Sequence, residues 1–365
     1  MDLTNFSDKD LAQNLIREIH NHADQLGTVK IMEVCGTHTM EIGRLGLRSI
    51  LPKNIELVSG PGCPVCVTPG AYIDAAVDLA LNKNVRIITY GDMVRVPGNQ
   101  TSLEEAKARG AEVHVVTSPL QALELARSNP HDEFVFLAVG FETTAPATAK
   151  ALFTAYEADL SNLSFFLSHR IVPPALAALI EGKDLNISGF MLPGHVSAII
   201  GEAPYQFLAA RGIPSVITGF EPLDILMGVV GLCKMMVEGA AKVVNAYSRI
   251  VKSEGNPLAV AAYEKVFQTA DAAWRGIGVI PMSGLVVRGP YKRYDASEKY
   301  GIVFSPSEPA LQPVGCSCGS VLKGKIKPSA CPLFGAACRP RTPVGPCMVS
   351  SEGSCAAYYK YEMTV

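Results

Sequence analysis

Short runs of β-branched and aromatic residues alternate with segments whose apolar positions repeat at helical spacing along much of the chain. The short apolar runs predict strands at residues 30–34, 55–58, 85–89, 112–116, 134–139, 163–167, 187–191 and 215–218. The segments between them predict helices, among them residues 9–22, 71–81, 103–109 and 119–127. This alternation is typical of βαβ units, so we predict an α/β protein with parallel sheets.

The pattern changes after the last of these strands. Residues 224–274 are predicted to be mainly helical, and from residue 276 onward Gly, Pro and Cys accumulate while regular periodicity fades. We therefore expect two Rossmann-like lobes, over residues 1–142 and 143–240. A third lobe, helical and Cys-rich, is expected over residues 241–365.

Composition limits the class of protein. The chain has 365 residues, of which 48% are hydrophobic and 18% charged, so it can bury a large core. A net charge of −2 leaves no basic excess for a phosphate backbone. The polar first residues do not resemble an export signal, and the longest apolar stretch, residues 225–233, is too short to span a membrane. We expect a cytoplasmic protein that binds neither nucleic acid nor membrane.

Ten cysteines change this picture. In a chain without an export signal, metal or redox chemistry explains such a number better than structural disulfides do. Six of them lie near the C-terminus, at Cys316, Cys318, Cys331, Cys338, Cys347 and Cys355. Three more, Cys35, Cys63 and Cys66, lie near the N-terminus, and Cys233 stands among apolar residues and is expected to be buried.

Chemically active segments follow the predicted strands. Cys35 and His38 follow the first strand, Cys63 and Cys66 the second, Glu142 the fifth and His195 the seventh. Ligands of doubly wound sheets bind beyond the carboxyl ends of the strands. We therefore expect these residues to line one or two clefts between the lobes.

The Cys63–Cys66 pair is a C-x-x-C motif between a strand and a predicted helix. A helix N-terminus favours a thiolate, so the motif suits reversible dithiol chemistry, with metal ligation and a structural role as alternatives. Cys35 and His38 offer a soft thiolate and an imidazole to a metal such as iron, and His38 could also keep Cys35 deprotonated. Glu142 and His195 could orient a ligand, and the alternatives are helix capping and ordinary hydrogen bonding.

The cysteines near the C-terminus are spaced C-x-C and then by twelve, six, eight and seven intervening residues. Structural zinc modules usually show two short C-x-x-C knuckles, which are absent from this segment. Thiolates spread along a Gly- and Pro-rich segment favour a cubane iron–sulfur cluster, with zinc and thiol pairs left open. Six thiols are available for four positions.

Together these segments resemble the HypD family of [NiFe]-hydrogenase maturation proteins. The resemblance covers nearly the whole chain. It is carried by residues 35–38, 60–66, 140–143, 193–197, 331–335 and 348–353.

The resemblance implies three α/β lobes, a [4Fe–4S] cluster and a scaffold on which iron carrying two cyanides and one carbon monoxide is assembled. It implies a HypC-type small chaperone, a HypE-type cyanide donor and, indirectly, the hydrogenase large subunit as partners. Cys35 would hold the iron, and Cys63 and Cys66 would be a redox pair whose reduction could expose a further thiolate, that of Cys66, to the iron. His38, Glu142 and His195 would line the cleft.

For the cluster we choose Cys318, Cys331, Cys338 and Cys355, with Cys316 as an alternative to Cys318 and Cys347 as a spare thiol. We expect electrons to pass from the cluster to the dithiol and on to the iron, in an assembly scaffold rather than a turnover enzyme. The alternatives are a disulfide reductase resembling ferredoxin–thioredoxin reductase and a zinc-stabilised binding module.

Overall fold

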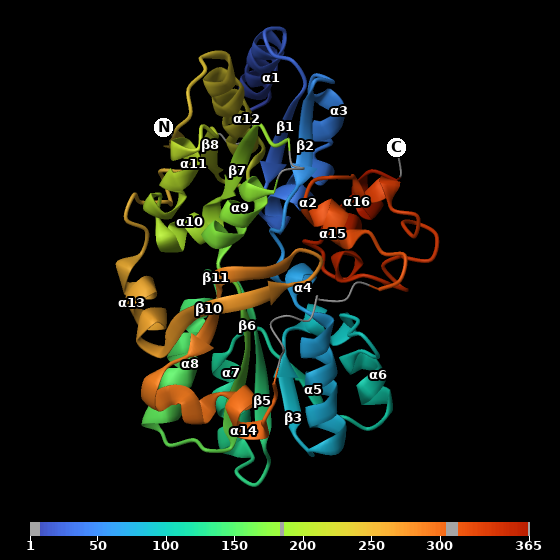
Figure 1. The fold of residues 1–365 in the computed structure, drawn as a ribbon, viewed down its shortest axis with the longest axis vertical. Coiled ribbons are helices and arrows are strands. Elements are labelled where there is room, and N and C mark those ends of the chain that lie inside the picture. Colours follow the sequence, from blue (N-terminus) through green and yellow to red (C-terminus); the bar gives the residue numbers. More distant parts are fainter. Residues whose placement is uncertain (1–7, 183–185, 304–312, 364–365) are drawn as a thin grey trace.

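Two parallel sheets form the body of the protein in the computed structural model, which describes residues 8–182, 186–303 and 313–363 (Figure 1). The five-stranded sheet has the order β2 (Ile55–Ser59), β1 (Val29–Glu33), β7 (Gly189–Pro193), β8 (Ser215–Thr218) and β9 (Val243–Asn245). The four-stranded sheet has the order β4 (Val113–Val115), β3 (Arg86–Thr89), β5 (Phe134–Gly140) and β6 (Leu163–His169). All neighbouring strands in both sheets are parallel, which confirms the predicted α/β class.

The helices connect these strands and continue into the C-terminal part. They are α1 (Lys9–Ala23), α2 (Gly36–Arg44), α3 (Leu47–Ile50), α4 (Pro64–Val67), α5 (Gly70–Asn82), α6 (Leu103–Ala108), α7 (Leu120–Ser128), α8 (Ala145–Glu157), α9 (Val172–Glu181), α10 (Gly194–Ile200), α11 (Gln206–Ala210), α12 (Pro222–Val237), α13 (Pro257–Val266), α14 (Ala296–Tyr300), α15 (Cys318–Leu322) and α16 (Ser354–Tyr361). In the described ranges, no helix is both long and apolar enough to cross a membrane.

The two sheets do not follow one another along the chain. The chain forms β1 and β2 of the five-stranded sheet, builds the whole four-stranded sheet, and returns to add β7 beside β1. The boundary expected between residues 142 and 143 falls between β5 and β6, which pair along their full length. The segment from β3 to β6 is therefore one insertion within the five-stranded sheet.

Local sequence explains how the long helices of the five-stranded sheet begin. The carboxylate of Asp8 accepts hydrogen bonds from the first backbone N–H groups of α1. Glu221 and Asp224 form a capping box at the start of α12, where Pro222 is the first helical residue. The apolar faces of α1 and α12 pack together in one core, which also holds Cys233 as the sequence predicts.

A hairpin replaces part of the helical segment predicted over residues 224–274. After α13, the strands β10 (Phe267–Trp274) and β11 (Gly278–Val287) pair in antiparallel fashion. The prediction is wrong here because β10 is rich in Ala, which favours helices, while burial of the aromatic residues at its two ends selects the strand. Figure 1 shows the hairpin between the two sheets, with its turn directed toward α4.

The hairpin ties the two sheets to the C-x-x-C segment. Trp274 is fully buried, stacks on Phe141 at the end of β5, and donates a 2.8 Å hydrogen bond from Nε1 to Ser283 Oγ. The next residue, Arg275, donates its backbone N–H to the carbonyl of Val67, the last residue of α4. The turn of the hairpin is therefore fixed beside Cys66.

The C-terminal segment, residues 313–363, packs against the five-stranded sheet. It consists of α15, α16 and turns, and α16 packs on α2. Arg48 joins the two parts, because it donates to Glu33 on β1 at 2.8 Å and to Glu362 after α16 at 2.6 Å. Its guanidinium also lies 4.5 Å from the ring centroid of Tyr358.

Candidate functional site

Two loops meet at the carboxyl ends of β1 and β2. These strands are parallel neighbours, so Cys35 after β1 and Cys63 after β2 come to the same edge of the sheet. Gly36 donates its backbone N–H to the carbonyl of Gly62 at 3.0 Å. A Cβ atom on Gly62 would lie 2.3 Å from the backbone nitrogen of Cys35, so only glycine permits this approach.

Cys35 is a buried thiol at the start of α2. Burial and, to a smaller extent, the nearby carboxylate of Glu352 raise its pKa to about 11, against the backbone N–H groups of α2, which lower it. Thr37 donates a 2.8 Å hydrogen bond to Glu352, and a Cβ on Gly36 would lie 2.5 Å from Glu352. Cys35 is therefore a protonated thiol at neutral pH, packed beside a carboxylate from the C-terminal segment.

His38 is anchored to the end of β8. Its Nε2 lies 2.8 Å from the carbonyl oxygen of Gly219 and 2.9 Å from Thr218 Oγ1, while Nδ1 has no hydrogen-bond partner in the described part of the chain. Burial lowers its pKa to about 4, so the ring is neutral. The idea that His38 keeps Cys35 deprotonated is therefore wrong, because a neutral imidazole supplies no positive charge to the thiol.

His195 lies on the same aromatic ring as His38. Its ring stacks on Phe220 at 4.0 Å between centroids, and His38 packs on Phe220 at 4.6 Å. Burial lowers the pKa of His195, and the carboxylate of Glu352 opposes this shift. Glu352 acts on both Cys35 and His195, so it belongs to this site. Sequence reasoning missed it as a site residue, although it lies within the segment 348–353 that carried the family resemblance.

The C-x-x-C pair is more deeply buried than expected. The Sγ atom of Cys63, the N-cap of α4, accepts a 3.2 Å hydrogen bond from the backbone N–H of Cys66. Burial raises the pKa of Cys66 well above its ordinary value. The lowered pKa expected for one thiol is not found at Cys66, because α4 has four residues and its N-terminus cannot offset complete desolvation.

All six cysteines of the C-terminal segment line one cavity of about 10 Å³. Their thiols also lie beside the C-x-x-C pair: the thiol of Cys66 neighbours that of Cys347, Cys347 neighbours Cys318, and Cys318 neighbours Cys316. Cys347, the spare thiol of the sequence prediction, lies between the two groups. The spacing of the cysteines carries no sign of this position.

The cysteine set fits an iron–sulfur cluster in chemistry. Iron–sulfur clusters are held by Cys thiolates, and the remaining lining residues include apolar Leu333, Phe334 and Met348. A cavity of about 10 Å³ holds one water molecule, so a cluster requires the thiols to move apart. In the described residues, no group of three or more His, Cys, Asp or Glu is placed to hold a metal ion, and all ten cysteines are free thiols.

Glu142 caps the helix α9. Its Oε1 accepts a 2.9 Å hydrogen bond from the backbone N–H of Val172, the first residue of α9. Its Oε2 is buried without a hydrogen-bond partner in the described residues. Burial raises the pKa of Glu142 to about 7, which the two backbone hydrogen bonds oppose. The sequence alternative was that Glu142 caps the helix that follows it, which is α8, whereas in the structure Glu142 caps the later helix α9.

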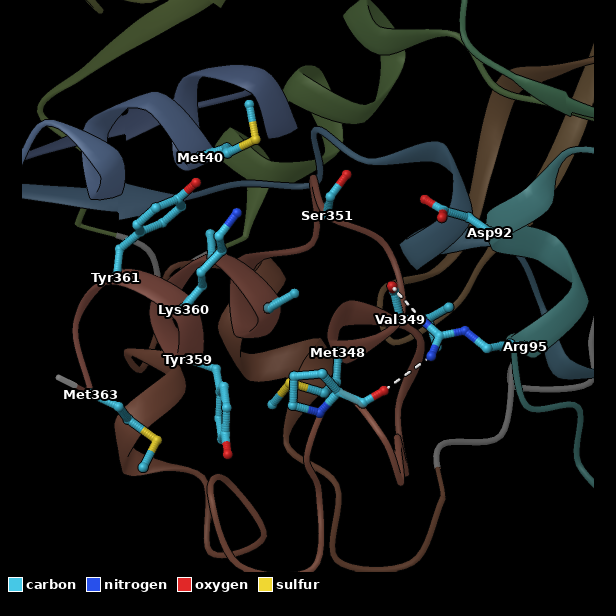
Figure 2. Close-up of a pocket in the computed structure, with 13 residues that line it drawn as sticks. Met40, Asp92, Arg95, Met348, Val349, Ser351, Tyr359, Lys360, Tyr361 and Met363 are labelled. Atoms are coloured by element: carbon cyan, nitrogen blue, oxygen red, sulfur yellow. Dashed lines mark hydrogen bonds between the residues drawn. The ribbon is translucent and has the colours of Figure 1, made fainter. Parts of the chain in front are cut away.

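A groove of about 740 Å³ adjoins the segment that carries Glu352 (Figure 2). Met40 of α2 and Lys360 of α16 lie on one side of it, and Asp92 and Arg95 of the turn η1 (Gly91–Arg95) lie on the other. Arg95 donates two hydrogen bonds to backbone carbonyls of the C-terminal segment. The groove therefore lies where α2, the insertion and the C-terminal segment meet.

Comparison with known proteins identifies the family. The chain matches HypD, described as "Hydrogenase formation hypA family", over residues 10–362. The chain belongs to the HypD family. It is 45% identical over 364 residues to the hydrogenase maturation factor HypD of Rhodobacter capsulatus, covering 98% of this chain and 97% of that protein. It is 46% identical over 358 residues to HypD of Escherichia coli, covering 95% of this chain and 94% of that protein.

An archaeal relative matches over a similar length. The putative hydrogenase expression/formation protein of Methanocaldococcus jannaschii is 42% identical over 360 residues, covering 98% of this chain and 99% of that protein. These matches confirm the family resemblance drawn from the motifs. The range matched to HypD includes every cysteine and all the predicted site residues.

The contact between the two loops is testable through Gly62. We expect Gly62→Ala to lower the free energy of unfolding by about 1–3 kcal/mol, because the added methyl group forces the Cys35 loop away. Urea unfolding measures this loss. Gly27→Ala is the matched control, since a Cβ at Gly27 meets nothing within 4 Å. Equal stability of the two variants would show that the loops are not in contact.

Glu142 predicts a pH dependence of stability. Its pKa is about 7 in the fold against 4.5 as the ordinary value, so the folded state holds the extra proton between these values. Stability should therefore fall as pH rises from 4.5 through 7, by at most ~3 kcal/mol from this group. Glu142→Gln should remove this fall, whereas Glu104→Gln, at an exposed position, should leave it. Urea unfolding at pH 5, 6, 7 and 8 measures the free energy of unfolding. The same dependence on pH in the unaltered chain and both variants would show that Glu142 is not the group responsible.

Proposed function

We propose that this chain is a hydrogenase maturation factor that serves as an assembly scaffold. On it, the Fe(CN)2CO group of [NiFe]-hydrogenase is built at Cys35, with a [4Fe–4S] cluster and the Cys63–Cys66 pair as the electron source. The observation that carries the proposal is the unbroken contact of thiols from Cys63 to Cys316, with Cys35 held against the C-x-x-C loop through Gly62.

The surroundings of Cys35 suit iron as cargo. Cyanide and carbon monoxide are strong-field ligands of low-spin ferrous iron, which a soft thiolate such as that of Cys35 binds well. With its Nε2–H donated to Gly219, His38 carries its lone pair on the unpartnered Nδ1, as a metal-binding imidazole does. Glu352 accepts from Thr37 and supplies negative charge beside the thiol. Because the Cys35 thiol is protonated at neutral pH, iron binding must release its proton.

The thiol contacts favour one of the two ligand sets for the cluster. Cys318 touches Cys347, which in turn touches Cys66, so Cys318 and Cys347 form a bridge to the C-x-x-C pair. This leaves Cys316, rather than Cys318, to join Cys331, Cys338 and Cys355 as ligands. When bound, a cluster supplies electrons singly.

Four other thiols form two pairs that touch each other: Cys63 with Cys66, and Cys318 with Cys347. A thiolate of one pair can attack a disulfide of the other through a mixed disulfide of Cys66 and Cys347, which moves the disulfide without loss of electrons. Net reduction of a pair takes two electrons and two protons, and its source is a low-potential one-electron donor acting through the cluster. The reduced Cys63–Cys66 pair then lies beside the iron bound at Cys35, where Cys66 is the second predicted iron-binding thiol.

The partners in this proposal are a HypC-type chaperone, a HypE-type cyanide donor and, through them, the hydrogenase large subunit. The names of the relatives describe maturation and formation factors, which act with other proteins of the same process. The groove between Met40 and Arg95 lies beside Glu352 and offers a surface close to the iron site. Ten reduced thiols suit the cytoplasm.

A second candidate function is reduction of protein disulfides, as in ferredoxin–thioredoxin reductase. The contact between Cys66 of the C-x-x-C pair and Cys347 of the C-terminal segment favours this function. It gives no role to the packing of Cys35, His38 and Glu352. The two functions are therefore separated by a variant at Cys35.

We expect Cys35→Ala to lose the iron–cyanide group completely, while iron–sulfur content and disulfide reduction remain. Infrared bands of cyanide and carbon monoxide, measured on protein purified anaerobically with its partners, report the loading. Cys233→Ala is the matched control, because Cys233 is also a buried thiol and lies away from this site, in the core between α1 and α12. Persistence of the infrared bands in the Cys35 variant would show that Cys35 does not hold the group, and absence of the bands from the unaltered chain would leave disulfide reduction as the function.

The choice of cluster ligand is tested by serine variants. We expect Cys316→Ser to lower acid-labile sulfide severely, and Cys318→Ser to keep about four iron and four sulfide per chain, as a cubane cluster requires. Chemical analysis and the cluster's electron paramagnetic resonance after reduction measure both. Loss of sulfide in the Cys318 variant alone would show that Cys318, as chosen from the sequence, and not Cys316 is the fourth ligand.

A further inference from the structure

Arg275 is a buried cation whose surroundings are incomplete. It lies in the turn of the hairpin, is 0% exposed, and donates Nη1–H to the carbonyl of Pro97 at 2.7 Å. Its Nε and Nη2 have no hydrogen-bond partner in the described residues. Leaving charged N–H donors buried and unpaired is costly, so such a residue is expected to face a group that carries negative charge.

No ion pair completes this site in the described ranges: Arg275 forms none within 4 Å, whereas the buried Arg48 pairs with two carboxylates. Burial, the largest effect, lowers the pKa of Arg275, and the thiols of Cys318, Cys347 and Cys316 and the carboxylate of Asp74 oppose this shift. Of these thiols, Cys316 is a proposed cluster ligand, while Cys318 and Cys347 form the bridge to Cys66. The backbone of Arg275 is also fixed to Val67, next to Cys66.

We propose that Arg275 is the counter-cation of the iron–sulfur cluster held by the C-terminal cysteines. Its Nε–H and Nη2–H groups would donate hydrogen bonds to the sulfur atoms of that cluster and its ligands. It is a positioning residue, since it acts on electron transfer through the charge of the cluster. This inference rests on the proposed function, because it requires a cluster or an equivalent group of thiolates in the cavity.

Charge balance gives the direction of the effect. Four thiolates around a [4Fe–4S]2+ core leave a net charge of −2, and reduction makes it −3. A fixed positive charge stabilises the more negative state, and hydrogen bonds to the sulfur atoms act in the same direction. Arg275 therefore raises the reduction potential of the cluster and makes it easier to reduce.

The same charge balance predicts that Arg275 affects the stability of the metal-free protein and of the cluster-loaded protein differently. In the metal-free protein the guanidinium of Arg275 is buried beside neutral thiols, so its charge is unbalanced. In the loaded protein that charge is balanced by the cluster. Replacing Arg275 by an apolar side chain of similar size should therefore cost the loaded protein more stability than the metal-free protein.

The experiment compares Arg275→Met with Arg170→Met. Arg170 is a matched control, because it is also buried beside the hairpin, but its guanidinium is hydrogen-bonded to the carbonyls of His169 and Ala273. Both variants and the unaltered chain are unfolded in urea, with the cluster and after its removal by a chelator. The reduction potential of the cluster is measured by titration followed by electron paramagnetic resonance.

We expect Arg275→Met to shift the reduction equilibrium at least tenfold toward the oxidised cluster, about 59 mV for a one-electron couple. It should also destabilise the loaded form more than the metal-free form, while Arg170→Met affects both forms equally and leaves the potential unchanged. A normal cluster at an unchanged potential in Arg275→Met would overturn the inference and leave the proposed function intact.

If Arg275→Met retains no cluster, its reduction potential cannot be measured, and a third variant is needed. Arg275→Lys keeps the charge and loses the planar fork of donors. Recovery of iron and sulfide in Arg275→Lys supports the role of the charge, and failure in this variant too overturns it. Absence of acid-labile sulfide from the unaltered chain would overturn the cluster itself, and with it both proposals.

Discussion

The site depends on backbones that touch without side chains between them. Gly62 brings the C-x-x-C loop against Cys35, and Gly36 brings α2 against Glu352 of the C-terminal segment. These two contacts join residues that lie far apart in the sequence, and a single methyl group at either position collides with its neighbour. Because the approach is set by backbone atoms, the relative positions of the thiols are fixed more rigidly than side-chain packing alone would fix them.

Burial then determines the chemical state of the thiols. Desolvation raises the pKa of Cys35 and Cys66. The pKa of Cys347 is lowered by Cys318 and raised, by more in total, by Cys66 and by burial. Without metal the three thiols are therefore neutral, and Cys66 and Cys347 can touch without repulsion. A metal or cluster must replace their protons, which links loading to pH and makes the empty and loaded sites different in charge. Under the proposed function, Arg275 lies close to the thiols whose charge changes on loading, and the loaded site then balances its buried charge.

The sequence predicted the parts of the protein that depend on local pattern. The strands predicted at residues 134–139 and 215–218 are apolar runs of ordinary length, and the structure has strands there, at Phe134–Gly140 and Ser215–Thr218. The pairing of β1 with β7 was not predictable, since it joins segments about 160 residues apart and is decided by tertiary packing. The bridging position of Cys347 was hidden for the same reason, because spacing along the chain does not report contact across it.

The insertion of one sheet into another gives the C-x-x-C pair its position. The chain leaves the five-stranded sheet after β2, forms α4, and only then builds the four-stranded sheet, so Cys66 lies at the junction of the two. The hairpin returns to this junction through Arg275 and Val67, and the C-terminal segment reaches it through Cys347. Three parts of the chain thus meet at one thiol. A displacement of any one of them alters the contact between Cys66 and Cys347, on which the proposed electron path to Cys35 depends.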